Sequence, residues 1–122
     1  MASNKIFNFG PVAMSSTLTT NILNPDTTSG GVGDNSTALY IVLRHIRIVN
    51  KTASPANFSL WRGATGANAA GTEVVGQAKV VPANDSYDWY GIMRFDTADF
   101  LVGGSGTATA LSIQGEGEVG VA

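Results

Sequence analysis

The sequence predicts an all-β protein, an antiparallel β-sandwich of Ig-like or jelly-roll-like type with an extended N-terminal arm. Short runs rich in β-branched and aromatic residues alternate with turn signals at a spacing of roughly ten residues. No segment shows a helical period of convincing length. Charged residues make up only 13% of the chain, so Glu and Lys, which favour exposed helix faces, are few. At 122 residues the chain has the size of one domain.

The first 38 residues are expected to form the arm and a turn-rich connection, and the sandwich domain is expected to span residues 39–122. Ile6, Phe7 and Phe9 make a short apolar patch that rarely forms a core element alone. We therefore expect this arm to pack on another surface, either its own domain or a neighbouring subunit.

The strongest predicted strand covers residues 39–50, a run rich in β-branched residues. Its second half alternates cleanly, with Ile46 and Ile48 inward and Arg47 outward. Its first half is apolar on both faces. This pattern predicts either a β-bulge near Arg44 and His45 or cover on the second face from another element or subunit.

The remaining strands follow from the same alternation. Phe58 and Leu60 share one face of a strand, with Trp61 on the other. In the final strand, the apolar residues Leu111 and Ile113 lie on one face. The same alternation continues through Gly115 and Gly117 to Val119 and Val121. Further strands, short or alternating, are expected in residues 18–23, 73–81, 86–95 and 97–102.

The composition excludes several kinds of chemistry. Cysteine is absent, so there is no disulfide, thiolate metal site or thiol nucleophile. His45 is the only histidine, and a lone histidine among scattered carboxylates is a poor metal site. The net charge of −2 without a basic cluster predicts no nucleic-acid partner. No window approaches the roughly 18 apolar residues of a membrane span. We expect no enzyme, cofactor, metal or membrane contact.

Three pairs of carboxylates are candidate sites: Asp85 and Asp88, Asp96 and Asp99, and Glu116 and Glu118. The two aspartate pairs lack the ligand density of a calcium loop and are expected to cap turns. The glutamate pair has the residue type used in glycoside hydrolysis, but it points away from the apolar phase of its strand. We expect it to face solvent or another subunit.

Four aromatic residues can form either a stacking platform for sugars or part of the core and an interface: Trp61, Tyr87, Trp89 and Tyr90. Aromatic residues within strands more often serve the core and interfaces.

Residues 39–122 resemble small β-sandwich structural proteins of tailed bacteriophage particles. The shared pattern comprises an Ile-x-Ile-x-Asn strand end, an x-Leu-Trp hairpin, a Pro-Ala-Asn turn, an acidic-Phe-Leu step and a closing strand ending Gly-x-Glu. It is carried by YIVLRHIRIVN, FSLWRGATG, VVPANDSYDWYG and FDTADFLVGGSGTATALSIQGEGEVGV. These motifs are structural, and the resemblance implies no catalytic residues.

The resemblance implies a non-enzymatic virion protein, made in the host bacterial cytoplasm. A capsid decoration protein bound to the major capsid protein is the first expectation, and a tail or head–tail accessory protein is the second. Low charge, an apolar arm and a strand apolar on both faces also predict a homo-oligomer with closed symmetry. The resemblance to decoration proteins, which sit at local threefold positions of a capsid, implies a trimer. A carbohydrate- or host-surface-binding module is the alternative. The expected subunit or partner contacts are Ile6, Phe7, Phe9, Trp61, Trp89 and Tyr90.

Overall fold

The computed structural model describes residues 5–23, 38–64, 66, 70–96, 99–107 and 109–121, with the backbone alone for residues 5–7, 38–39 and 119–121. These residues form strands and turns, which confirms the predicted all-β class. No helix in this part of the chain has the length and hydropathy needed to cross a bilayer. The strands are β1 (Lys5–Ala13), β2 (Asn21–Leu23), β3 (Ala38–Asn50), β4 (Ala56–Gly63), β5 (Lys79–Val81), β6 (Ser86–Phe95), β7 (Phe100–Ser105) and β8 (Leu111–Val121).

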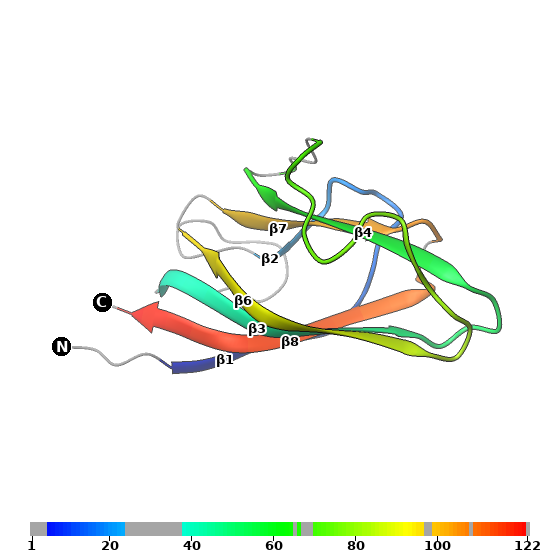
Figure 1. Cartoon of the computed structure of the whole chain (residues 1–122), viewed down its shortest axis with the longest axis horizontal. Coiled ribbons are helices and arrows are strands. Elements are labelled where there is room, and N and C mark those ends of the chain that lie inside the picture. The colour runs from blue at the N-terminus through cyan, green and yellow to red at the C-terminus, as the bar shows by residue number, and fades with distance from the viewer. Residues whose placement is uncertain are drawn as a thin grey trace.

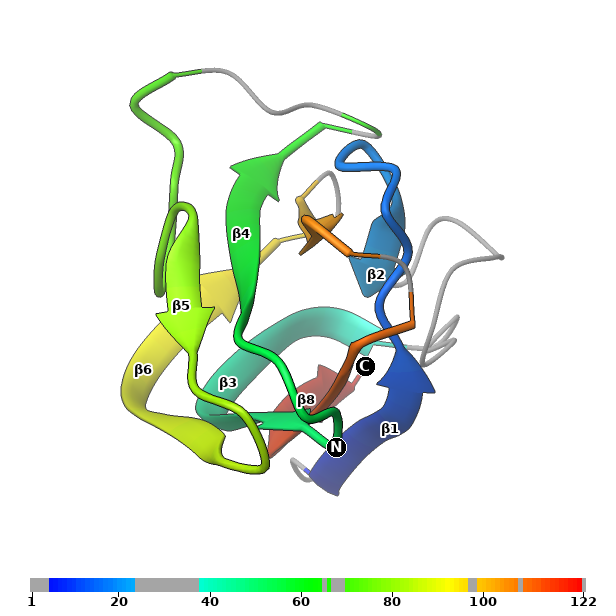
Figure 2. The same cartoon turned by 90° about the vertical axis from the view of Figure 1, so that its right-hand side faces the viewer.

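The strands form two antiparallel sheets that pack face to face (Figure 1). Sheet A has the order β1-β8-β3-β6, and sheet B has the order β2-β7-β4-β5. Strands β5 and β6 lie at one side of the sandwich, and β1 and β2 lie at the other (Figure 2). The pairs β1–β8, β2–β7, β3–β6 and β4–β5 are those of an antiparallel ribbon rolled into two sheets. Of the two predicted sandwich types, this is the jelly roll.

The described part of the N-terminal segment packs on its own domain, one of the two expected alternatives, but it does so as strands of both sheets and not as an extended arm. β1 pairs with β8 from Lys5↔Val119 to Ala13↔Ser112, and β2 pairs with β7. The Phe9 side chain is only 3% exposed and belongs to the main core. The described part of the segment therefore supplies one strand to each sheet, and position 38 does not separate it from the sandwich. The pairing partners lie about 100 residues away for β1 and about 80 residues away for β2, and local patterning does not encode such distant pairing.

The β3 strand contains the bulge that the sequence predicted as one of two alternatives. Leu43 pairs with Gly117 of β8, whereas His45 pairs with the preceding Glu116, so Arg44 is the extra residue. The register with β6 shifts at the same place but in the opposite sense, because two β6 residues, Gly91 and Ile92, lie opposite the single residue Arg44. Ile41 and Leu43 are buried before the bulge, and Ile46 and Ile48 are buried after it. The bulge thus changes which sequence phase faces the core.

The main core lies between the sheets, and each of the eight strands contributes buried side chains to it. Its largest fully buried side chains include Phe58, Phe95, Leu23, Ile41, Leu43, Ile46, Ile48, Leu60, Leu101, Leu111 and Ile113. A second, small cluster comprises Trp61, Phe100 and Val102. The alternation along β4 confirms that Trp61 points away from the face that carries Phe58 and Leu60.

Candidate interaction surface

The outer face of sheet A gathers ionisable side chains around His45. The bulge in β3 turns Arg44 and His45 toward the outer surface, next to outward residues of β6 and β8. His45 Nε2 lies 2.8 Å from Asp88 Oδ1, and Nδ1 lies 3.7 Å from Glu116 Oε1. The imidazole also stacks on the Tyr90 ring, with 4.6 Å between ring centroids. Both ring nitrogens thus face carboxylates, which indicates an ion-pair network.

Arg47 completes this network. Its Nε donates to Asp88 Oδ1 at 2.8 Å, the same oxygen that faces His45. The hydrogen bond from Arg47, and after it the contact with His45, hold the pKa of the Asp88 carboxyl below its ordinary value of 3.8. The Asp88 carboxylate in turn raises the pKa of the Arg47 guanidinium. A separate exposed pair joins Arg44 to Glu118 at 2.8 Å.

The Asp88 contacts predict a dependence of stability on pH. Because its folded-state pKa is depressed, Asp88 stabilises the fold above the ordinary pKa of 3.8, and this contribution is lost as the pH falls through the lower folded-state value. We expect Asp88→Asn to be less stable than the parent chain near pH 7, with the gap narrowing below about pH 4. Urea unfolding across this pH range measures it, with the neutral change Gln114→Ala as a control that keeps the parent profile. A constant gap would contradict the assignment.

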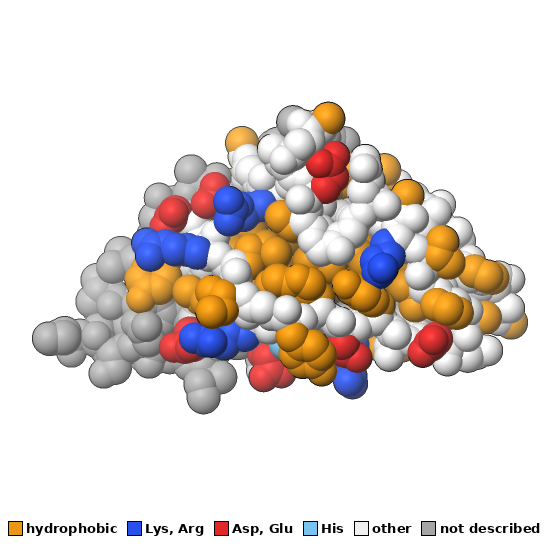
Figure 3. Space-filling model, viewed as in Figure 1, with side chains coloured by type: hydrophobic (Ala, Val, Ile, Leu, Met, Phe, Trp, Pro, Cys, Tyr) orange, Lys and Arg blue, Asp and Glu red, His pale blue; other side chains and the backbone are white. Residues whose placement is uncertain are grey.

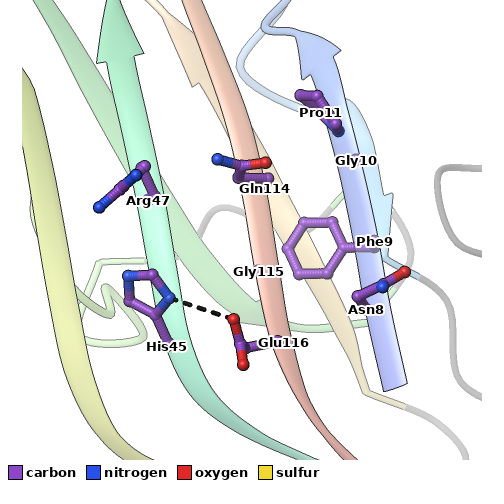
Figure 4. A pocket seen from close by; sticks show the side chains of 9 residues that line it. All are labelled: Asn8, Phe9, Gly10, Pro11, His45, Arg47, Gln114, Gly115 and Glu116. Carbon is purple, nitrogen blue, oxygen red and sulfur yellow. Dashed lines mark ion pairs between the residues drawn. The ribbon is translucent and has the colours of Figure 1, made fainter. Parts of the chain in front are cut away.

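A polar hollow of about 520 Å³ lies on the same face, between β1, β8 and β3 (Figure 4). It lies where β1 bulges between Phe9 and Val12, beside residues 114–116 of β8. Gly10 sits in that bulge with a φ of 76°, and a Cβ there would meet the Ile113 carbonyl oxygen. The lining residues are Asn8, Phe9, Gly10, Pro11, His45, Arg47, Gln114, Gly115 and Glu116. Amides and charged groups of both signs therefore point into one shallow site, which suits a hydroxyl-bearing ligand or a polar protein loop.

Apolar side chains lie on the outer face of β6, at the edge of sheet A. Tyr90 is 70% exposed and Ile92 is 73% exposed. The exposed hydrophobic side chains on one side of the molecule lie among acidic and basic groups (Figure 3). Large apolar side chains standing together on a strand are typical of a contact surface.

The structure separates the six residues expected to make contacts. Phe9 and Trp61 are buried within the chain itself, and Trp89 is half-buried against the main core. Burial inside the chain leaves Phe9 and Trp61 unsuited as subunit contacts, whereas a contact by the half-buried Trp89 stays a prediction. Tyr90 is exposed, as a contact residue requires. The backbones of Ile6 and Phe7 pair with β8, but their side chains lie outside the described residues.

Ile92 is the surface residue that the sequence analysis missed. It shares its phase of β6 with Asp88, Tyr90 and Arg94, and it is the one aliphatic residue in that outward phase. An aliphatic side chain in an otherwise polar or amphipathic phase was the signal that could have identified it.

The four aromatic residues weighed as a stacking platform do not gather on one surface. Trp61 is buried in sheet B, whereas Tyr90 faces outward from sheet A. Tyr87 and Trp89 pack against the main core, and the Tyr87 ring lies 5.8 Å from that of Phe58. A flat platform made of these four residues is therefore not formed.

The carboxylate pairs have local partners. Asp85 Oδ1 accepts a hydrogen bond from the Ser86 N–H, and Asp99 Oδ2 accepts one from the Asp96 N–H, which is turn capping as expected. Glu116 lies 3.7 Å from the His45 imidazole, and Glu118 pairs with the Arg44 guanidinium. Within the described residues, no three His, Asp or Glu side chains are grouped so as to hold a metal ion.

Comparison with known proteins adds no relative. No protein-family model, no curated protein and no solved structure matches this chain.

Proposed function

We propose that this chain is a non-enzymatic structural protein of a tailed bacteriophage particle, a decoration protein that binds the outer capsid lattice as an oligomer. The observation that carries the proposal is the jelly-roll strand order, in which β1 to β8 pair as a rolled ribbon. Jelly rolls are common in viral capsid domains, and here that fold-level analogy joins the sequence resemblance of residues 39–122.

The surface supports an assembly role on physical grounds. Charged residues are few, so flat contacts with a shell can form with little desolvation of charge. The major capsid protein would be the partner. A protein that binds only the assembled shell stabilises it by mass action, because binding lowers the free energy of the assembled state alone.

Counting copies in particles tests the proposal. Virions produced by the host that carries this gene are purified on a density gradient, and the chain is quantified by mass spectrometry against an isotope-labelled standard. We expect hundreds of copies per particle and a lower disruption temperature for particles that lack the chain. A few dozen copies or fewer would instead support a tail or head–tail accessory protein. Absence from the particles would overturn the proposal.

Carbohydrate binding is the second candidate, and the polar hollow is the observation that favours it. Asn8, Gln114 and Glu116 line this hollow, and such groups hydrogen-bond to sugar hydroxyls. Lectin domains also use jelly rolls. The test is a glycan array on which binding by the parent chain is lost in Gln114→Ala; no binding by the parent chain would remove this candidate.

A further inference from the structure

The outward edge of β6 is unpaired in the part of the chain that the structure describes. β6 is the last strand of sheet A, and its partner on the inner side is β3. An edge strand presents backbone N–H and C=O groups that can pair with another strand. This edge is ten residues long, and it carries the exposed Tyr90 and Ile92 on its outer face. Its pairing with β3 is irregular at Gly91 and Ile92, which together face Arg44. Natural edge strands that remain monomeric are usually short or carry charges at such positions.

We propose that β6 pairs antiparallel with β6 of a second copy of this chain, about a two-fold axis at Gly91. Directly opposed residues in an antiparallel pair lie on the same face, so the outward residues of one strand must oppose outward residues of the other. The two-fold axis must therefore pass through a residue and not between two neighbouring residues. We compare the three central residues of β6 as its position: Tyr90, Gly91 and Ile92.

Among these registers, the one centred on Gly91 is self-complementary. It places Tyr90 opposite the second copy's Ile92, and Asp88 opposite its Arg94. Centring the axis on Tyr90 leaves Asp88 opposite Ile92, and centring it on Ile92 sets Asp88 against Asp96, two like charges. Directly opposed apolar or oppositely charged side chains stabilise a strand pair, whereas like charges destabilise it. A two-fold axis repeats each favourable pair twice.

The side chains are already placed for this contact. Asp88 uses Oδ1 for both of its contacts within the chain, which leaves Oδ2 to meet a guanidinium. The Arg94 side chain is held by Asp96 at 2.8 Å and lies over the Tyr40 ring, with its head group exposed. Stacking on His45 fixes the Tyr90 ring before association. Such preorganisation lowers the entropy lost on binding.

One backbone group of the edge already has a partner. The Arg94 carbonyl oxygen accepts a hydrogen bond from Arg62 Nη1 at 2.9 Å. A carbonyl oxygen has two lone pairs, so it can accept a second bond from a neighbouring strand. The two-fold pair that we propose replaces the trimer implied by the resemblance to decoration proteins, and it does not depend on the proposed role in a virion.

The register can be tested with two charge variants of the full-length chain. Tyr90→Lys/Ile92→Lys sets lysine against lysine across the axis, whereas Tyr90→Glu/Ile92→Lys sets glutamate against lysine. Both variants lose the same exposed side chains and the same stacking on His45, so they are matched. Val80→Lys is the control, because Val80 is 59% exposed on β5, the edge strand of sheet B.

The measurement is solution mass by light scattering over a hundredfold dilution, with circular dichroism to confirm folding. We expect the parent chain and Val80→Lys to be dimers, and the double-lysine variant to dissociate with a dissociation constant raised on the order of 100-fold. The glutamate–lysine variant should remain a dimer that weakens at high salt. A parent chain that is a monomer or a trimer, or a double-lysine variant that still dimerises, would overturn the proposal. Dissociation of both double variants would overturn the Gly91-centred register. Copy number in virions is a separate readout, so either proposal can fail alone.

Discussion

Replacing Phe9 with alanine is expected to reduce the free energy of unfolding by about 3 kcal/mol, the range seen for large-to-small changes in cores. The Phe9 side chain is 3% exposed and lies in the main core. Its ring covers Gly115, where a Cβ would come within 2.5 Å of the Phe9 Cε1 atom. Removing the ring therefore opens a cavity that β8 has no side chain to fill.

Urea unfolding followed by tryptophan fluorescence measures this loss. Asn8→Ala is the matched control, because Asn8 is the exposed neighbour in the same strand, and its effect should stay within about 0.5 kcal/mol. If residues 5–13 were an arm outside the sandwich, both variants would unfold like the parent chain. A Phe9→Ala variant as stable as the parent would thus show that β1 does not contribute to the domain.

Local patterning predicted most of the elements, because strands carry a period of two that the sequence displays directly. The bulge in β3 was one of two alternatives that this pattern predicted, because residues 39–43 are apolar in both phases, whereas Ile46 and Ile48 after His45 alternate with the polar Arg47. Pairing between distant strands leaves no such local signal. The pairing of β1 with β8 is of this distant kind, so the sequence did not predict that residues 5–13 form a strand of sheet A.

The candidate surface was predictable only in part. Alternation along β6 placed Tyr90 on the outward phase, and the structure has it there. Trp61 was also assigned correctly to the face of β4 opposite Phe58 and Leu60, but that face is covered near Phe100 and Val102. Alternation tells which residues share a face, whereas burial of a face depends on packing from elsewhere in the chain. The polar hollow could not be predicted either, because its lining residues come from β1, β3 and β8, which only the pairing of distant strands brings together.

The second large effect is expected at Gly117, where alanine should reduce the free energy of unfolding by about 3 kcal/mol, the upper range for overpacking. Gly117 pairs with Leu43 at the β3 bulge, where the extra residue changes the register of β3 with β8. A Cβ at Gly117 would overlap the carbonyl oxygen of Val42. Because that atom belongs to the backbone, no side-chain rotation can relieve the contact, and the β3–β8 ladder has to shift.

This ladder runs from Ala38↔Val121 to Asn50↔Leu111, so a shift in it disturbs the centre of sheet A. Thermal or urea unfolding compares Gly117→Ala with Gln114→Ala, an outward position on the same strand that should lose less than about 1 kcal/mol. Equal stabilities of the two variants would mean that the β3 backbone can relax around a methyl group at this position. A loss of stability confined to Gly117→Ala would support the view that the bulge in β3 requires a glycine at the facing position of β8. The bulge turns His45 outward, and it leaves no room for a side chain at residue 117.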